Sequence, residues 1–158
     1  MPDGVGAWRI VEDDLSGAPI RALLEQHFAG MLANSPAGSC HFLDFDGLNS
    51  PDVTFWSIHQ GGVLAGCGAL KLLGAAHGEI KSMRTSDAFL RQGVAARLLD
   101  HIIAAARKRG LKRLSLETGS SAAFDPAIAL YRRYGFADCE PFADYRSDPF
   151  SRFMTRAR

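Results

Sequence analysis

Apolar residues recur along this chain with two spacings, every second position in some stretches and every third or fourth position in others. The first spacing is typical of strands and the second of helices. The helical spacing and its end signals indicate helices over Ala18 to Leu32, Gly93 to Arg109 and Ala127 to Tyr134. The β-like runs predict strands over Trp8 to Glu12, Val53 to Gln60, Val63 to Leu73, Glu79 to Thr85, Leu111 to Thr118 and Arg152 to Arg156.

Glycine and proline mark the ends of several of these segments. Gly61 and Gly62 separate two apolar runs and supply the positive φ angles of a tight hairpin turn. Asp125 and Pro126 are typical of the N-cap and first residue of a helix. The segment 34–52 is polar with an apolar insert, which predicts a loop or short helix with buried anchors.

The order of the segments predicts the fold class. Antiparallel strands come first, and a strand, a helix and a second strand then form one parallel βαβ crossover. This is an α/β, or mixed α+β, arrangement. A chain of 158 residues is long enough for one core but short for two, so we expect a single domain over 1–158.

Composition and charge narrow the possible partners. Apolar residues make up 47% of the chain and the formal net charge is +1, which gives no basic surplus for nucleic acid or an anionic membrane surface. The start of the chain lacks a signal-peptide pattern, and no apolar run is long enough to span a membrane. Three widely spaced cysteines indicate reduced thiols, with Cys67 a small core residue. We therefore expect a cytoplasmic protein.

The glycine segment before the second long helix is the strongest candidate binding site. The backbone N–H groups around Arg91, Gly93 and 94–96 surround a helix start, where they have no intrahelical acceptors. Such a start attracts anions, and a phosphate or pyrophosphate is the expected ligand. The alternative is that Gly93 and the alanines allow the helix to pack closely on a sheet, and the segment alone favours neither.

Other phosphate and catalytic motifs are missing from the sequence. There is no Walker motif, no three-glycine dinucleotide fingerprint, no serine elbow, no Cys-x-x-Cys pair and no His-Glu-x-x-His helix. Cys40 and His41 are neighbours, and neighbours in an extended chain point to opposite sides, so they make a poor catalytic dyad. Hydrolase and zinc-site interpretations are therefore weak, and no metal is expected.

Three segments together resemble the GNAT superfamily of acyl-CoA-dependent N-acetyltransferases: GEIKSMRTSDAFLRQGVAARLL, LSLETG and AIALYRRYGF. The resemblance runs from about Gly78 to Phe136. Leu90 stands where the superfamily's pyrophosphate motif has Gln or Arg, and the later positions of the motif fit. Within the superfamily, SCHFLD, DVTFW, SLETG and PFADYRSDPFSRFM are similar to a bacterial subgroup named YsnE-like or indole-acetate acetyltransferases.

The resemblance implies a largely antiparallel mixed sheet with helices on both faces, and acetyl-CoA as the cofactor. The pyrophosphate would lie on the helix start, and the pantetheine arm would lie between two parallel strands that separate, with 115–118 as the opposite wall. A backbone N–H near Met83 would hold the thioester oxygen. The implied cofactor-binding residues are Met83, Arg84, Thr85, Arg91, Gln92, Gly93, Val94, Ala95, Ala96 and Tyr131.

Acetyl transfer to an amine needs a proton acceptor and a proton donor. An alkyl amine with a pKa near 10.4 is about 99.9% protonated at pH 7, so a general base is useful. Glu79 lies where many GNAT enzymes hold a catalytic glutamate, and burial would make it a better base. Tyr131 aligns with the usual general acid, whereas Tyr134 resembles a packing residue. The alternatives are a solvated Glu79 and a Tyr131 that belongs only to the core.

The acceptor pocket is expected between the segments 39–44 and 145–151. His41, Asp44, Tyr145 and Asp148 are the candidate substrate-binding residues, since they could orient an amine. For Asp44 and Asp148 the alternative is turn capping, a frequent role of aspartate. The expected partner is a small-molecule amine, and the sequence leaves a homodimer open.

Three functions remain at this point. The first is an N-acetyltransferase acting on a small or amino-acid-like amine. The second is a non-catalytic acyl-CoA-binding or sensing module that keeps the phosphate site without the acid and base. The third is a structural α/β domain, which predicts no CoA binding and treats Gly93 as a packing residue.

Overall fold

The computed structural model describes residues 7–34, 44–74 and 76–157. One sheet has the strand order β1-β2-β3-β4-β5-β7-β6. Its strands are β1 (Trp8–Glu12), β2 (Val53–Gln60), β3 (Val63–Leu72), β4 (His77–Thr85), β5 (Arg113–Gly119), β6 (Ala137–Asp138) and β7 (Ser151–Ala157). The helices are α1 (Ala18–Asn34), α2 (Phe45–Leu48), α3 (Val94–Lys108) and α4 (Asp125–Arg133), with short 3-10 turns at Asp87–Phe89 and Ala122–Phe124.

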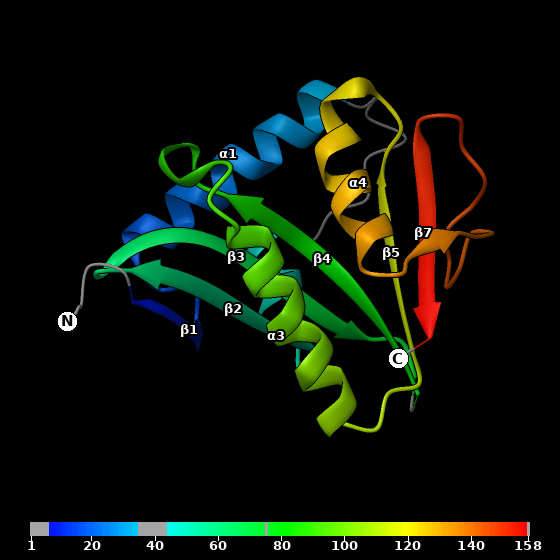
Figure 1. The fold of residues 1–158 in the computed structure, drawn as a ribbon, viewed down its shortest axis with the longest axis horizontal. Coiled ribbons are helices and arrows are strands. Elements are labelled where there is room, and N and C mark those ends of the chain that lie inside the picture. Colours follow the sequence, from blue (N-terminus) through cyan, green and yellow to red (C-terminus); the bar gives the residue numbers. More distant parts are fainter. Residues whose placement is uncertain (1–6, 35–43, 75, 158) are drawn as a thin grey trace.

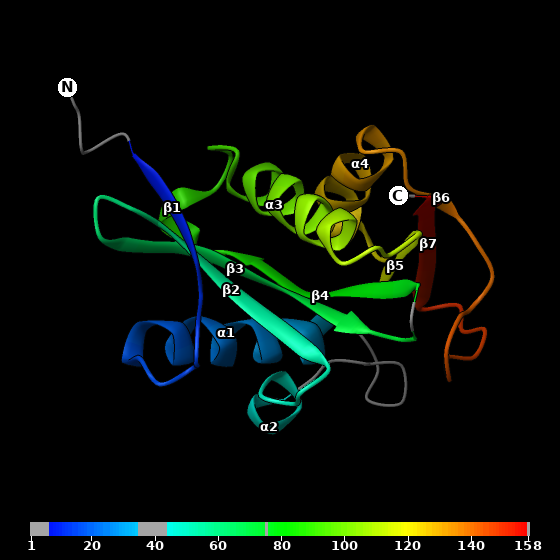
Figure 2. The same ribbon diagram turned by 90° about the horizontal axis from the view of Figure 1, so that it is seen from below.

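The elements form three layers, with α3 and α4 on one face of the sheet and α1 and α2 on the other (Figure 2). Leu98, Leu99 and Ile102 lie on the buried side of α3 and belong to the larger apolar cluster. Leu23 and Leu24 of α1 belong to a second cluster on the opposite face. Helices α1 and α3 thus cover opposite sides of the same strands, β3 and β4, which confirms the predicted mixed α/β fold.

The predicted hairpin and parallel crossover are both present. β2 and β3 pair antiparallel around Gly61 and Gly62, whose φ angles are +58° and +83°. β4 and β5 pair in parallel on either side of α3. The N-cap prediction for Asp125 was wrong, because the preceding 3-10 turn already places Asp125 in helical geometry as the first residue of α4. The two-residue strand β6 was missed because it is too short to show a period.

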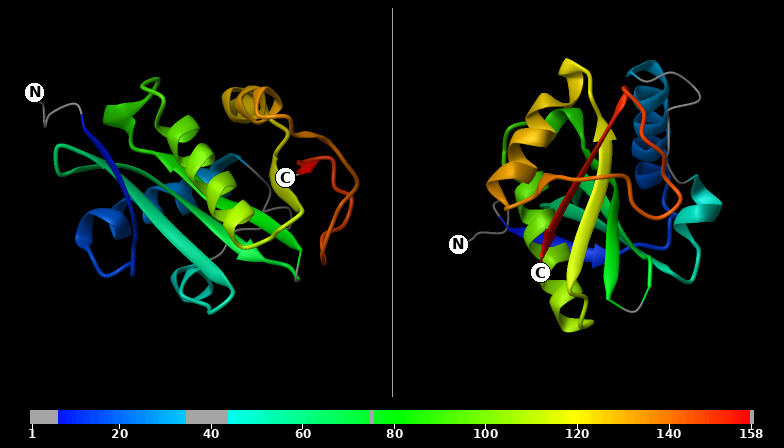
Figure 3. Two further views of the ribbon diagram at one scale, coloured as in Figure 1. Left: turned by 60° about the horizontal axis from the view of Figure 1, so that its bottom comes forward. Right: turned by 90° about the vertical axis from the view of Figure 1, so that its right-hand side faces the viewer.

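β4 and β5 separate along their length, and this separation shapes the site. They pair only where His77 to Ile80 lies beside Arg113 to Leu116. β4 then continues to Thr85 beside β3, and β5 continues to Gly119 beside β7. The two strands diverge towards the top of Figure 1, and Figure 3 shows the gap from two further sides.

A β-bulge changes which face of the sheet β4 presents to each helix. The register passes from Ala69 opposite Lys81 to Cys67 opposite Arg84, so β4 holds one extra residue there. Ser82 lies in this bulge with φ +56°, and the Cys67 thiol donates a hydrogen bond to its carbonyl at 3.4 Å. The extra residue reverses the alternation of side chains after Lys81.

Because of the bulge, Met83 points to the α3 face and Arg84 to the α1 face. Simple alternation along the strand predicts the reverse. Met83 packs beside Ile102 of α3, where a Cβ on Gly68 would come within 2.5 Å of its sulfur. Arg84 lies beside Gly30 of α1. Lys81 and Arg84 therefore share the α1 face. None of the helices in the described ranges is long and apolar enough to cross a membrane.

Candidate active site

A pocket of about 250 Å³ occupies the gap between β4 and β5. Its lining comes from both faces of the sheet, with Met31 of α1 on one side and Ala127 of α4 on the other. The remaining lining residues are His27, Gly30, Ile80, Lys81, Ser82, Met83, Arg84, Glu117, Thr118, Ala123, Phe124 and Tyr131. A ligand in this pocket can therefore contact groups on both faces of the sheet.

The start of α3 presents backbone N–H groups with no helical acceptor. Gly93 is the N-cap with φ +80°, and no side chain caps this helix. A Cβ on Gly93 would meet no atom within 4 Å, so close packing does not explain this glycine. The positive φ does explain it, because side chains disfavour that backbone conformation. Arg91 and Gln92 are exposed beside it, so the segment leaves room for an anion.

Tyr131 of α4 is a buried phenol at the edge of the pocket. It is 7% exposed and packs edge-on against Phe136. Burial raises the pKa of Tyr131 to about 12, so its hydroxyl keeps its proton at neutral pH. Tyr134 instead donates a hydrogen bond to the carbonyl of Ala96 at 3.2 Å, which fits the packing role predicted for it.

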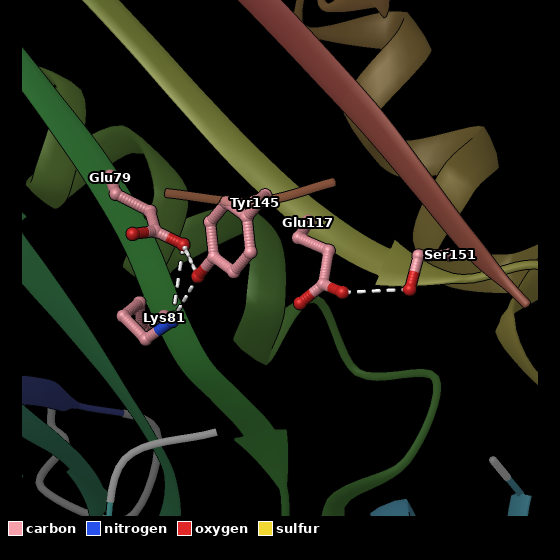
Figure 4. A network of polar contacts seen from close by, with 5 residues as sticks. All are labelled: Glu79, Lys81, Glu117, Tyr145 and Ser151. Carbon is pink, nitrogen blue, oxygen red and sulfur yellow. Dashed lines mark hydrogen bonds and ion pairs between the residues drawn. The ribbon is translucent and has the colours of Figure 1, made fainter. Parts of the chain in front are cut away.

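Glu79 is buried beneath the segment that connects β6 and β7. It is 2% exposed, so the solvated interpretation of this residue was wrong. The Tyr145 hydroxyl donates to Oε2 of Glu79 at 2.5 Å, and Nζ of Lys81 lies 3.1 Å from the same oxygen (Figure 4). Lys81 also donates to the Tyr145 hydroxyl at 2.7 Å. Burial, and next the charge of Glu79, raise the pKa of Tyr145.

Lys81 was missed by sequence reasoning, although it stands two residues from Glu79 on the same face of a strand. Its side chain is 8% exposed, and it lines the pocket, whereas Glu79 does not. The ring of Tyr145 packs against Phe142 and Phe153. The three polar groups therefore hold the β6–β7 segment against β4, and Lys81 extends the network to the pocket.

Glu117 of β5 is a second carboxylate that sequence reasoning missed. It lines the pocket and accepts a hydrogen bond from the Ser151 hydroxyl at 2.8 Å. Figure 4 shows it across Tyr145 from Glu79. The alternation of LSLETG could have marked it, since Leu114 and Leu116 are buried on one face and Glu117 must point to the other.

Of the predicted substrate-binding residues that the structure describes, none lines this pocket, and Tyr145 reaches it only through its hydrogen bond with Lys81. Asp44 is exposed and accepts a hydrogen bond from the Gly47 amide at 2.9 Å, which caps α2. Asp148 accepts from the Phe150 amide at 2.8 Å in a turn. Both contacts match the capping alternative. His41 lies outside the described residues.

Of the residues predicted on β4 for the cofactor, Met83 and Arg84 line the pocket and Thr85 does not. Cys67 is fully buried, as expected of a core residue, and burial raises the pKa of its thiol to about 12. Within the described ranges, no group of three or more His, Cys, Asp or Glu side chains could hold a metal ion.

The separated parallel strands, the open helix start and the pocket define a class of protein. The pattern of the acetyltransferase (GNAT) family matches residues 17–136, well over half of the chain. The chain therefore belongs to the GNAT family and is an acetyltransferase.

Particular relatives agree with this class. The chain is 56% identical over 144 residues to the uncharacterized N-acetyltransferase YsnE of Bacillus subtilis (strain 168), covering 91% of this chain and 95% of YsnE. It is 55% identical over 146 residues to the uncharacterized N-acetyltransferase YedL of Escherichia coli (strain K12), covering 92% of each. An IAA acetyltransferase of Azospirillum brasilense is 41% identical over 122 residues, covering 77% of this chain and 78% of that protein.

Solved structures share the fold. A Klebsiella pneumoniae protein assigned to the acyl-CoA N-acyltransferases superposes with a TM-score of 0.77 at 29% identity, covering 95% of this chain and 97% of that one. A GNAT acetyltransferase of Elizabethkingia anophelis, with acetyl-CoA bound, superposes with a TM-score of 0.66 at 18% identity, covering 96% and 98%.

Proposed function

We propose that this protein transfers the acetyl group of acetyl-CoA to the amine of a small-molecule acceptor. The observation that carries the proposal is the pocket in the gap between β4 and β5, which is lined from both faces of the sheet. In such a pocket a donor would contact the α3 and α4 side while an acceptor contacts the α1 side. The two reactants then meet in one orientation, which is a large part of catalysis.

The donor side is suited to an anionic cofactor. The pyrophosphate would lie on the amides of 91–96, where Gly93 leaves open space and the helix dipole favours negative charge. The arm of the cofactor would then run along β4 past Met83 into the gap. A main-chain N–H of this strand segment would hold the thioester oxygen as negative charge develops on it.

The chemical step needs one proton removed and one supplied. The neutral amine attacks the thioester carbonyl carbon, a C–N bond forms, and the C–S bond breaks. Tyr131 is the proposed donor of a proton to the departing thiolate, because its raised pKa keeps it protonated beside the pocket. The proton that the amine loses passes to a carboxylate on the α1 face.

Two carboxylates are candidates for that base. Glu117 lines the pocket, so an amine can approach it directly. Glu79 is held by Tyr145 and Lys81, so it would accept the proton through one of them or through water. The geometry favours Glu117 as the contacting base and Glu79 as the residue that orients Tyr145 and Lys81.

Calorimetry with CoA, followed by thiol release from acetyl-CoA across a panel of amines and amino acids, tests the proposal. Indole-acetate joins the panel because one relative is named an IAA acetyltransferase. We expect micromolar to millimolar CoA affinity and acceptor-dependent thiol release. CoA binding without thiol release would instead support the acyl-CoA-binding module. Absence of CoA binding would reject both functions.

A further inference from the structure

The α1 side of the pocket holds a guanidinium in an unusual position. The bulge at Ser82 turns Arg84 towards α1, where its Nη1 lies 3.2 Å from the position that a Cβ on Gly30 would take. Glycine is unfavourable inside a helix such as α1. The guanidinium packed against this helix explains why position 30 is a glycine, because any side chain there would press on Arg84.

Arg84 is a charged residue of the pocket lining that forms no ion pair with a carboxylate in the described ranges. Lys81, the other lysine or arginine in the lining, forms an ion pair with Glu79. No hydrogen bond or ion pair joins the Arg84 guanidinium to any residue in the described part of the chain. The neighbouring His27 does not add charge at neutral pH, because burial, and next Arg84, lower its pKa to about 4. A half-buried cation of this kind is stabilised by an anionic ligand.

The shape of the Arg84 guanidinium and the charge on the opposite wall of the pocket narrow the class of ligand further. A guanidinium matches a carboxylate through two parallel hydrogen bonds. Glu117 lies on the β5 side of the same pocket, where it would attract an ammonium group. A positive group on one strand and a negative group on the other suit a ligand that carries both an amine and a carboxylate.

We infer that the acceptor is an amino acid, or a small amine with a carboxylate close to it, and that Arg84 binds this carboxylate. The inference rests on the proposed function and specifies its acceptor. Met31 of α1 supplies apolar lining on this side of the pocket, so the side chain of the acceptor is expected to be apolar.

The test compares matched pairs of acceptors that differ only in the carboxylate: phenylalanine with phenethylamine, and methionine with 3-(methylthio)propylamine. The measured quantity is the ratio of kcat/KM for the amino acid to that for the amine. We expect the wild-type protein to favour the amino acid, and Arg84→Met to reduce the ratio by about ten- to a hundredfold, the effect of a lost charge-assisted hydrogen bond. Arg84→Lys should retain part of the preference. Arg97→Met, at an exposed arginine of α3, should leave the ratio unchanged.

Gly30→Ala provides a second variant that keeps the charge. It should press on the guanidinium and raise KM for the amino acid more than for the amine, while alanine strengthens the helix. Equal kcat/KM for the two members of each pair in the wild-type protein would overturn the inference. So would an equal loss for both members in Arg84→Met, or a preference for phosphoethanolamine over the amino acids.

A binding measurement separates this inference from the proposed function. In the presence of CoA, phenylalanine or methionine should raise the melting temperature of the wild-type protein and not of Arg84→Met. If this shift occurs while no thiol is released, the carboxylate site stands and the proposed transfer fails. If thiol is released only with amines that lack a carboxylate, the transfer stands and the carboxylate site fails. If neither the melting-temperature shift nor thiol release is seen, the carboxylate site and the proposed transfer both fail.

Discussion

The two sides of the gap between β4 and β5 offer a ligand different kinds of chemical group. On the α3 side the groups available are main-chain amides around Gly93, with small side chains beside them. On the α1 side they are charged side chains, with Glu79, Lys81 and Arg84 from one strand and Glu117 from the next. The first arrangement suits a ligand common to a whole family, because it depends on the backbone. The second suits an acceptor particular to this chain, because single substitutions can change it.

Tyr131→Phe is expected to give the largest effect and to leave the α1 side intact. The change removes the proposed proton donor and keeps the ring contact with Phe136, so kcat should fall about a hundredfold or more, with CoA affinity nearly unchanged. Steady-state kinetics and calorimetry measure the two. Tyr134→Phe is the matched control, with turnover near that of the wild type. A Tyr131→Phe variant with normal kcat and a lower melting temperature would leave only a packing role.

Glu117→Gln tests the α1 side with the donor side unchanged. We expect kcat/KM to fall about a hundredfold near pH 7, because the variant cannot take the amine's proton. The loss should shrink as pH rises towards the pKa of the amine, where solvent supplies the neutral form.

Glu79→Gln is the comparison variant for Glu117→Gln. It should lower the free energy of unfolding by about 1–3 kcal/mol, since it leaves the buried Lys81 without its charged partner. A larger loss of kcat/KM at neutral pH in Glu79→Gln than in Glu117→Gln, with stability kept, would reverse the two proposed roles.

His27 lies in α1, and His27→Gln is expected to change how the free energy of unfolding depends on pH. The pKa of His27 is about 4 in the folded protein, below its ordinary value of 6.5, so the unfolded chain binds the proton more readily. The stability that neutral His27 gives the folded protein is therefore fully present above pH 6.5 and is lost as pH falls towards 4. Between pH 7 and pH 5 the wild type should lose about 2 kcal/mol more than His27→Gln.

Urea unfolding at the two pH values measures this difference for His27. His59→Gln, at a half-buried histidine of β2, is the control substitution. If the free energy of unfolding changes with pH in the same way in the wild type and in His27→Gln, the fold does not keep His27 neutral, and this prediction fails.

Gly93→Asp against Gly93→Asn gives the smallest expected effect and tests the α3 side. Both residues tolerate a positive φ and are favourable N-caps, so both variants should fold. Only aspartate places a negative charge at the proposed pyrophosphate position. Calorimetry should give a Kd for CoA about tenfold higher for Gly93→Asp than for Gly93→Asn. Equal affinities would place the pyrophosphate elsewhere.

The sequence alone determined most of the helices and strands of this protein, and with them the helix start at Gly93. The helix start at Gly93, the hairpin at Gly61 and Gly62 and the crossover around α3 each follow from signals within a short stretch of chain. Local signals of this kind predict the folded structure correctly because they reflect backbone angles and the periods of helices and strands. For the same reason the position of Tyr131 on an amphipathic helix could be predicted.

Only the tertiary structure decided the α1 side. Simple alternation along β4 places Arg84 on the same face as Ile80, and the one-residue bulge at Ser82 moves it to the face of Lys81. The contact of Tyr145 with Glu79 joins residues 66 positions apart. Register shifts and long-range contacts depend on how separate segments pack against one another, and no local pattern of residues encodes that packing.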